Sequence, residues 1–138
     1  MRPLIALAVD LGGSHANCAI VQERKEVRSR TIATSGNDGL MAVLALVSVA
    51  LRELAAQEAM SLTDIRGLDV GFCGLVDRRQ GRVTASSGKY EDAPARDLPG
   101  WARNELGLRL VLENYTRMTL FGDRYAGEQL RDSTTWPW

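Results

Sequence analysis

The sequence lacks the features that mark several specialised classes of protein. Seventeen basic and seventeen acidic side chains cancel, so no excess of positive charge directs the chain to nucleic acid or to an anionic membrane. Its two cysteines, Cys18 and Cys73, have no metal-ligand spacing and stand in apolar or glycine-rich settings, which favours buried free thiols over a disulfide framework. No apolar run is long enough for a signal peptide or a membrane span, and we therefore expect a cytoplasmic protein.

What the sequence does have is an ordinary globular composition and a strong pattern near its start. Its 138 residues suffice for one domain with a sizeable core. The apolar run at residues 4–9 predicts a buried strand, and Asp10-Leu11-Gly12-Gly13-Ser14-His15 follows it directly. Residues 16–21 predict a second strand, which excludes the Rossmann and Walker nucleotide motifs, because both need a helix after their glycines. The segment is therefore either a plain Gly-Gly hairpin turn or a phosphate-binding turn.

The rest of the chain alternates helical and extended patterns. Apolar residues at helical spacing predict a helix at residues 40–58, and residues 35–38 supply turn and N-cap side chains in front of it. Strands are predicted at 26–33, 68–72 and 108–112, helices at 101–106 and 115–130, and loops with a short hairpin at 78–100. The resulting order, β-β-β-α-β-α-β-α, predicts a mixed sheet in an α/β domain.

Four segments, in this order, are similar to the ROK family of sugar kinases and sugar-responsive repressors. They are Asp10-Leu11-Gly12-Gly13-Ser14, Val70-Gly71-Phe72-Cys73-Gly74-Leu75-Val76-Asp77, Asp97-Leu98-Pro99-Gly100-Trp101 and Val111-Leu112-Glu113-Asn114-Tyr115. They resemble the family's DxGGT, GxPGxVD, tryptophan-ended loop and ENDANAAALGE segments. The resemblance implies an actin-like (ribonuclease H-like) ATPase lobe of α/β class. It implies an N-terminal lobe at residues 1–130 and an irregular tail at 131–138, with the second lobe absent.

On the nucleotide side, the resemblance implies a site at the first turn. Asp10 would face the metal, the backbone at Gly12 and Gly13 would approach a nucleotide phosphate, and the Ser14 hydroxyl would donate to it. His15 stands where the family often has a lysine, and a largely neutral imidazole attracts phosphate more weakly. Taken from the residue alone, His15 is equally well explained as a polar turn residue.

On the sugar side, the resemblance implies that Asn114 hydrogen-bonds a sugar hydroxyl and that Lys89, Asp92 and Gly74 line the sugar pocket. The residue types alone also allow simpler roles. Asn114 could cap a loop, while Lys89 and Asp92 could be solvated surface charges.

The departures from the family pattern concern catalysis. The family's catalytic aspartate follows the asparagine, and this sequence has Tyr115 there, whose phenol is protonated at neutral pH and is a poor proton acceptor. Glu113 cannot simply replace it, because neighbours on an extended segment point to opposite faces. The family's second phosphate loop, adenosine pocket and Cys/His zinc motif are also missing, and two distant cysteines cannot form that zinc site.

Taken together, these features predict a ROK-type sugar kinase-like protein. In the full-length family, ATP with Mg²⁺ phosphorylates a hexose such as glucose. We expect this chain to be a truncated lobe that is inactive alone, binds a hexose-type sugar, and holds no zinc. We expect self-association through an uncovered cleft face, and no nucleic-acid or membrane partner. The alternative is a non-catalytic sugar-binding or regulatory protein of the repressor branch.

Overall fold

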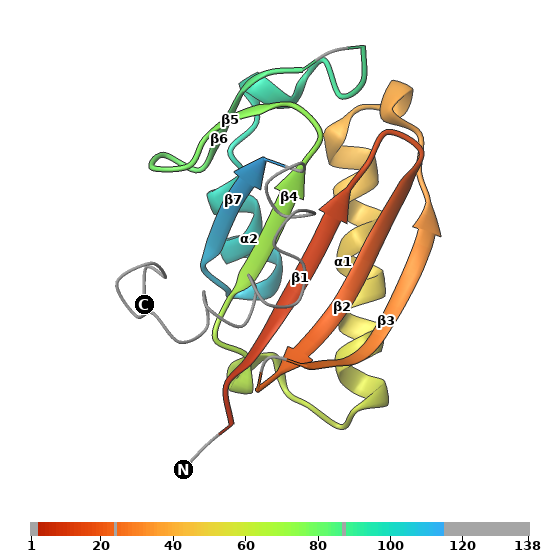
Figure 1. Cartoon of the computed structure of the whole chain (residues 1–138), viewed down its shortest axis with the longest axis vertical. Helices are drawn as coiled ribbons and strands as arrows, with labels where there is room; N and C mark the ends of the chain where they lie inside the picture. Colours follow the sequence, from red (N-terminus) through yellow and green to blue (C-terminus); the bar gives the residue numbers. More distant parts are fainter. Residues whose placement is uncertain (1–2, 24, 87, 115–138) are drawn as a thin grey trace.

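The computed structural model describes residues 3–23, 25–86 and 88–114, and these residues form an α/β domain around one sheet. The sheet has five strands in the order β3-β2-β1-β4-β7 (Figure 1). The strands are β1 (Ile5–Leu11), β2 (His15–Gln22), β3 (Lys25–Ala33), β4 (Leu68–Phe72) and β7 (Leu110–Asn114). Neighbours β1, β2 and β3 run antiparallel, whereas β1, β4 and β7 are parallel. The mixed sheet predicted from the sequence is therefore confirmed.

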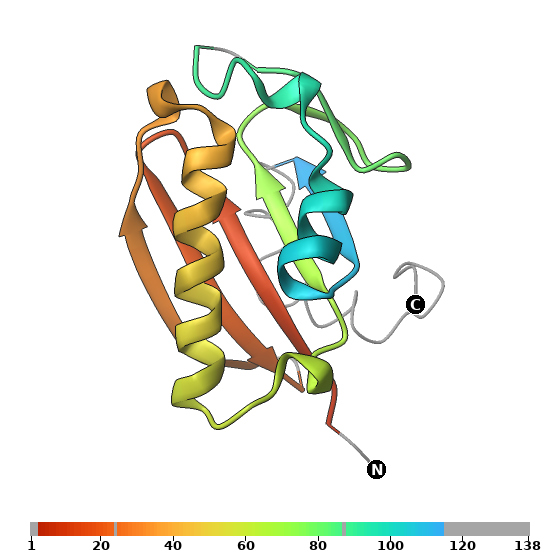
Figure 2. The same ribbon diagram turned by 180° about the vertical axis from the view of Figure 1, so that it is seen from behind.

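Both described helices cover the same face of this sheet. Helix α1 (Leu40–Gln57) and helix α2 (Leu98–Leu106) lie behind the strands in Figure 1 and in front of them in Figure 2. The apolar stripe predicted for α1 is buried, with Val43, Leu51 and Leu54 each at most 1% exposed. The stripe packs on inward-facing side chains of the sheet in one continuous core.

Helix α1 corrects one expectation. By length and composition alone it is apolar enough to cross a membrane, so the prediction that no segment reaches that length was wrong. Such a helix is weak evidence for a membrane span, because half of it is buried inside the domain and core helices pass the same test.

The other face of the sheet carries a different set of side chains. Ala6, Val21 and Val111 form a small apolar cluster there. Asp10 and Glu113 are both paired with Gly71 in the sheet, and Asp69 lies two residues before Gly71 on β4. Because side chains alternate between the two faces along a strand, all three carboxylates lie on this face. Within the described residues, neither helix lies over this face. The helix predicted at 115–130 and the tail at 131–138 lie outside the described residues.

Between β4 and β7 the structure refines the sequence prediction. A two-stranded hairpin, β5 (Leu75–Asp77) and β6 (Arg82–Ala85), follows β4, so the hairpin begins before the region 78–100 in which a short hairpin was predicted. Helix α2 begins three residues earlier than expected, because the Asp97 side chain caps it by accepting from the Gly100 N–H at 3.0 Å. The last described strand is shifted to Leu110–Asn114, which places Asn114 at its carboxyl end.

Candidate functional site

The carboxyl ends of three parallel strands bring the predicted site segments to one edge of the sheet. Leu11 of β1 pairs with Phe72 of β4, and Phe72 pairs with Asn114 of β7, so the three strands end at one level. The turn after β1, Gly74 after β4 and Asn114 therefore meet at this edge, which we call the strand-end edge. Ligands of open α/β sheets bind outside the carboxyl ends of strands, so the placement suits a binding site.

The first segment of the strand-end edge is a tight hairpin turn. The Gly12 N–H donates to the His15 carbonyl at 2.9 Å, and a Cβ on Gly12 would lie 3.0 Å from that oxygen. The Ser14 Oγ and His15 Nδ1 are 2.9 Å apart, and both side chains are exposed. In the described part of the chain, the N–H groups of Gly13 and Ser14 have no hydrogen-bond acceptor. This geometry fits both the plain hairpin turn and a turn that presents N–H groups to an anion.

A loop distant in sequence is built onto this turn. Tyr90 is fully buried, and its hydroxyl donates to the Gly12 carbonyl at 2.7 Å. Its backbone N–H donates to the Gly36 carbonyl at 3.0 Å, while the Gly36 N–H donates to the Gly13 carbonyl at 3.1 Å. The ring centroid lies 5.7 Å from that of Phe72. Sequence reasoning missed Tyr90; its one signal was an aromatic residue inside an otherwise polar loop.

Lys89, the residue before Tyr90, lies across the turn. A Cβ on Gly13 would meet the Lys89 Cγ at 3.0 Å, and a Cβ on Gly36 would meet the Lys89 Cβ at 2.8 Å. The aliphatic stem therefore passes between two glycines that leave room for it, while the residue as a whole remains exposed. The structure brings Lys89 to the predicted phosphate turn; its predicted contact with sugar stays a prediction.

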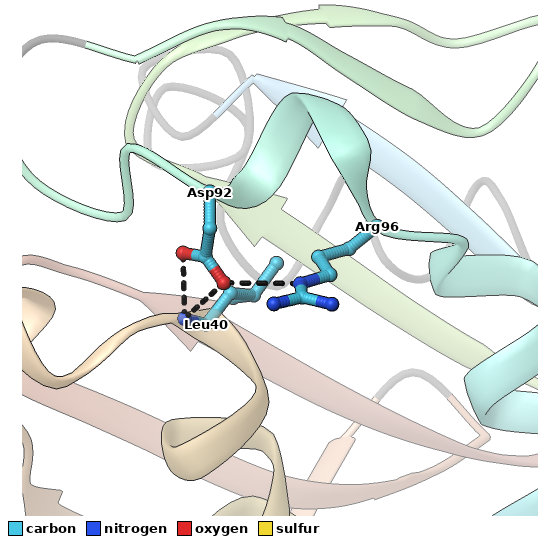
Figure 3. Close-up of polar contacts among 3 residues, drawn as sticks. All are labelled: Leu40, Asp92 and Arg96. Atoms are coloured by element: carbon cyan, nitrogen blue, oxygen red, sulfur yellow. Dashed lines mark hydrogen bonds and ion pairs between the residues drawn. The ribbon is translucent and has the colours of Figure 1, made fainter.

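Asp92 has a structural partner in the described domain. Its carboxylate oxygens accept from the Leu40 N–H at 2.9 and 3.2 Å, and Arg96 Nε lies 3.1 Å from Oδ2 (Figure 3). Partial burial acts to raise the pKa of Asp92, but these hydrogen bonds outweigh it and hold the pKa below its usual value. Asp92 thus caps α1 from a distance, because the N-cap residue Gly39 has no side chain to do so. The predicted role of residues 35–38 as side-chain caps is not observed.

Asn114 and Gly74 lie in contact. The Asn114 Nδ2 donates to the Gly74 carbonyl at 2.6 Å. A Cβ on Gly74 would lie 2.4 Å from the Ala85 carbonyl oxygen, so only glycine fits there. The hydrogen bond fits the loop-capping alternative, and it also fixes the Asn114 amide at the strand-end edge. Tyr115, in the position of the family's catalytic aspartate, lies outside the described residues.

Three carboxylates lie on the face of these strands that neither described helix covers; Asp69 and Glu113 are buried there, and Asp10 is partly buried. Glu113, with a fully buried side chain, pairs with Arg78 Nε at 2.6 Å. Both oxygens of Asp69 and the Oδ1 of Asp10 are buried without a hydrogen-bond partner among the described residues. Burial raises the pKa of Asp10 to about 6. Burial and then the Glu113 charge raise the pKa of Asp69 to about 8, with Arg78 opposing the shift and Asp10 adding to it.

These carboxylates do not form a metal centre by themselves. Within residues 3–23, 25–86 and 88–114, no group of three or more His, Cys, Asp or Glu side chains has the geometry to hold a metal ion. Mg²⁺ in phosphoryl-transfer sites is held by one or two carboxylates together with substrate phosphates. Asp10, with one buried unpartnered oxygen beside the turn, fits that modest requirement.

A cavity of about 1030 Å³ lies away from the strand-end edge. It is lined by the β5–β6 turn, α2 and the amino end of β7, and four arginines, Arg78, Arg79, Arg103 and Arg109, contribute to its lining. None of the residues predicted to bind nucleotide or sugar lines it, so the cavity does not correspond to the predicted site.

No family model and no curated protein matches the sequence. Solved structures do match. The Lmo2764 protein of Listeria monocytogenes, a candidate N-acetylmannosamine kinase, is 23% identical with a TM-score of 0.70, covering 91% of this chain and 40% of that one. The ROK hexokinase of Thermus thermophilus is 17% identical with a TM-score of 0.64, covering 82% and 35%. A ROK-family transcriptional regulator, a homologue of the E. coli MLC protein, is 15% identical with a TM-score of 0.59, covering 93% and 32%.

These likenesses are at the level of fold. The chain spans about a third to two fifths of the length of the matching structures. The actin-like lobe expected from the sequence is confirmed, because the neighbours include kinases and a regulator that share the ROK architecture. The described part of this chain therefore has the fold found in ROK-family sugar kinases and repressors.

Proposed function

We propose that this chain is the phosphate-turn and sugar-binding lobe of a ROK-type sugar kinase. The single observation that carries the proposal is the convergence, at the strand-end edge, of the Gly12–Ser14 turn with Gly74 and Asn114. In a kinase, one site must hold a sugar hydroxyl in line with the phosphoryl group that it attacks. An edge that combines a turn presenting N–H groups with a fixed amide side chain meets both halves of that requirement.

The described residues divide these tasks between two groups. At the turn, the Gly13 and Ser14 N–H groups and the Ser14 hydroxyl would donate to phosphate oxygens. With a pKa of about 6, Asp10 is mostly ionised at neutral pH, and it would hold Mg²⁺, which neutralises phosphate charge when bound. Asn114, held at its amide by Gly74, would orient a hydroxyl of a hexose. These roles, and the identity of the sugar as a hexose, are part of the proposal.

A second candidate function is sugar sensing without phosphorylation. A ROK-family regulator shares this fold, and the sequence has Tyr115 where a kinase of the family has its proton-accepting aspartate. A protonated phenol does not accept a proton from a sugar hydroxyl at neutral pH. In this alternative, the same strand-end edge binds sugar and the turn has no catalytic role.

Ligand-observed NMR with a panel of hexoses and Mg-ATP tests the proposal. We expect one hexose to bind in the millimolar range, about −4 kcal/mol, because an open lobe leaves the sugar exposed to water. Asn114→Ala should abolish this binding, while Ser14→Ala should leave it unchanged. Asn104→Ala, on the exposed side of α2, is the matched control. Binding of no hexose, or equal binding by the Asn114→Ala variant, would contradict the proposal.

A further inference from the structure

We propose that the Gly12–Ser14 turn binds a polyphosphate chain, such as that of a nucleoside triphosphate, and that Lys89 supplies the positive charge at this site. The proposal rests on the function proposed above and reassigns Lys89 from the sugar to the phosphate. It concerns a residue outside the turn motif itself, contributed by a loop that is 75 positions further along the chain, between Gly88 and Tyr90.

The path of the lysine stem carries the proposal. A Cβ on Gly13 would lie 3.0, 3.4 and 3.5 Å from Cγ, Cδ and Cε of Lys89, so the stem runs along this glycine for three successive carbons. On its other side, a Cβ on Gly36 would lie 2.8 and 2.9 Å from the Lys89 Cβ and Cδ. The Nζ is one bond beyond Cε. The ammonium is therefore held near Gly13, whose N–H would face the same phosphate.

The loop that carries Lys89 is fixed to the turn on its next residue. The Tyr90 hydroxyl and N–H are bound to the Gly12 and Gly36 carbonyls at 2.7 and 3.0 Å. Tyr90 is also held at a positive φ of 54°, a conformation that tertiary contacts must maintain in a residue with a side chain. Because the backbone beside Lys89 is already ordered, a phosphate would lose little of its binding energy to ordering the loop.

The charged and polar groups around the turn explain why a phosphate would need a cation such as Lys89 there. The Asp10 carboxylate at the end of β1 repels a phosphate, and the His15 imidazole is engaged with the Ser14 hydroxyl at 2.9 Å. A lysine ammonium offers three donors and a fixed positive charge, which suits a phosphate chain. The sequence contains only one other lysine, Lys25, which begins β3 at the end of the β2–β3 hairpin remote from His15.

The two-lysine composition allows a clean test. The ¹⁵N-labelled full chain is titrated with sodium tripolyphosphate and separately with Mg-ATP, and the Gly12, Gly13 and Ser14 amide signals are followed by NMR. Lys89→Met keeps an aliphatic stem over both glycines but removes the charge, Lys89→Arg keeps a charge, and Lys25→Met is the matched control. We expect Lys89→Met to weaken tripolyphosphate binding about tenfold. Lys25→Met should not change it, and Lys89→Arg should keep most of the affinity.

A second measurement maps the lysine directly. An acyl-phosphate derivative of ATP transfers its acyl group to a nearby lysine Nζ, which attacks the acyl carbon and releases ATP. Mass spectrometry should find Lys89 acylated in preference to Lys25, and excess tripolyphosphate should suppress only the Lys89 product. Equal labelling of both lysines, or equal tripolyphosphate affinity of Lys89→Met and the unmodified chain, would overturn the role of Lys89. If the turn amide signals respond to neither polyphosphate, the turn does not bind phosphate. If the unmodified chain also binds no hexose, the proposed function itself is overturned.

Discussion

Replacing Asp69 with asparagine should stabilise this domain at neutral pH and leave it unchanged in acid. Asp69 is the second residue of β4, is 2% exposed, and has no hydrogen-bond partner among the described residues for either carboxylate oxygen. Burial and the neighbouring Glu113 raise its pKa from 3.8 to about 8. The unfolded chain, in contrast, releases this proton near pH 4.

The sign and size follow from proton linkage. Because the folded pKa is raised, stability contributed by protonated Asp69 is complete below pH 4 and is lost progressively as the pH rises towards 8. Each pH unit in this window costs about 1.4 kcal/mol, or about 4 kcal/mol by pH 7. The amide that Asp69→Asn introduces does not titrate, but it is also buried without a partner. We therefore expect a gain of about 1 to 4 kcal/mol at pH 7 and almost none at pH 4.

Urea unfolding of both proteins at several pH values between 4 and 8 measures this difference. The slope of unfolding free energy against pH should be shallower in Asp69→Asn than in the unmodified chain, and the two curves should converge in acid. Asp38→Asn is the control, because Asp38 is an exposed aspartate in the short helical turn Gly36–Asp38 that precedes α1. A gain of the same size at pH 4 and pH 7 would refute the titration of Asp69 as its cause.

Four further predictions concern the ion pair, the distant cap, activity and self-association. Arg78→Met should destabilise the domain by about 3 kcal/mol at pH 7, because it removes the guanidinium that lies 2.6 Å from the fully buried Glu113 carboxylate and leaves that charge unpaired. Adding Glu113→Gln should recover much of the lost stability in the same urea assay. Asp92→Ala should cost about 1 kcal/mol at pH 7 by uncapping α1. Since the pKa of Asp92 is lowered, this contribution is present above pH 4 and lost in acid, so an Asp92→Ala deficit that persists undiminished in strong acid would contradict a charged cap. The chain alone should show no hexokinase activity in a coupled assay with Mg-ATP and a hexose panel, and turnover near 1 s⁻¹ would contradict this. We also expect concentration-dependent self-association by sedimentation, because apolar Met41, Leu46 and Val49 are 42%, 52% and 54% exposed on α1; a monomer at all concentrations would count against it.

Local patterns were sufficient to predict the elements that depend on near neighbours. The apolar run at 68–72 matches β4 at both ends, and the spacing of the apolar residues in α1 predicted its buried stripe. The strand-turn-strand order around Gly12 and Gly13 was also correct. In each case the signal is a period of two or 3.6 residues, or a pair of glycines, and is contained within one element.

The remaining features depend on pairs of residues that are far apart in the sequence. Asp92 caps α1 across 52 positions, and the Tyr90 hydroxyl reaches Gly12 across 78. Neither pairing has a periodic signal, because each is set by how the loop returns over the sheet. Asp69 shows the same limit: a carboxylate within an apolar run was visible in the sequence, but the neighbours that raise its pKa or oppose the shift come from β7, β1 and the β5–β6 turn.

The alternation of side chains along β7 bears most directly on catalysis. Asn114 reaches the Gly74 carbonyl on one side of the sheet, whereas Glu113 pairs with Arg78 on the other. Glu113 is therefore separated from the proposed sugar position by the sheet itself, and its charge is already neutralised by an arginine. The resemblance to the ROK family places the proton acceptor at position 115, where the sequence has a tyrosine; an ordinary phenol is a poor proton acceptor at neutral pH. The expectation that the chain lacks kinase activity thus depends on the alternation of side chains along one strand, and the same alternation leaves Asn114 at the strand-end edge, where we propose that sugar binds.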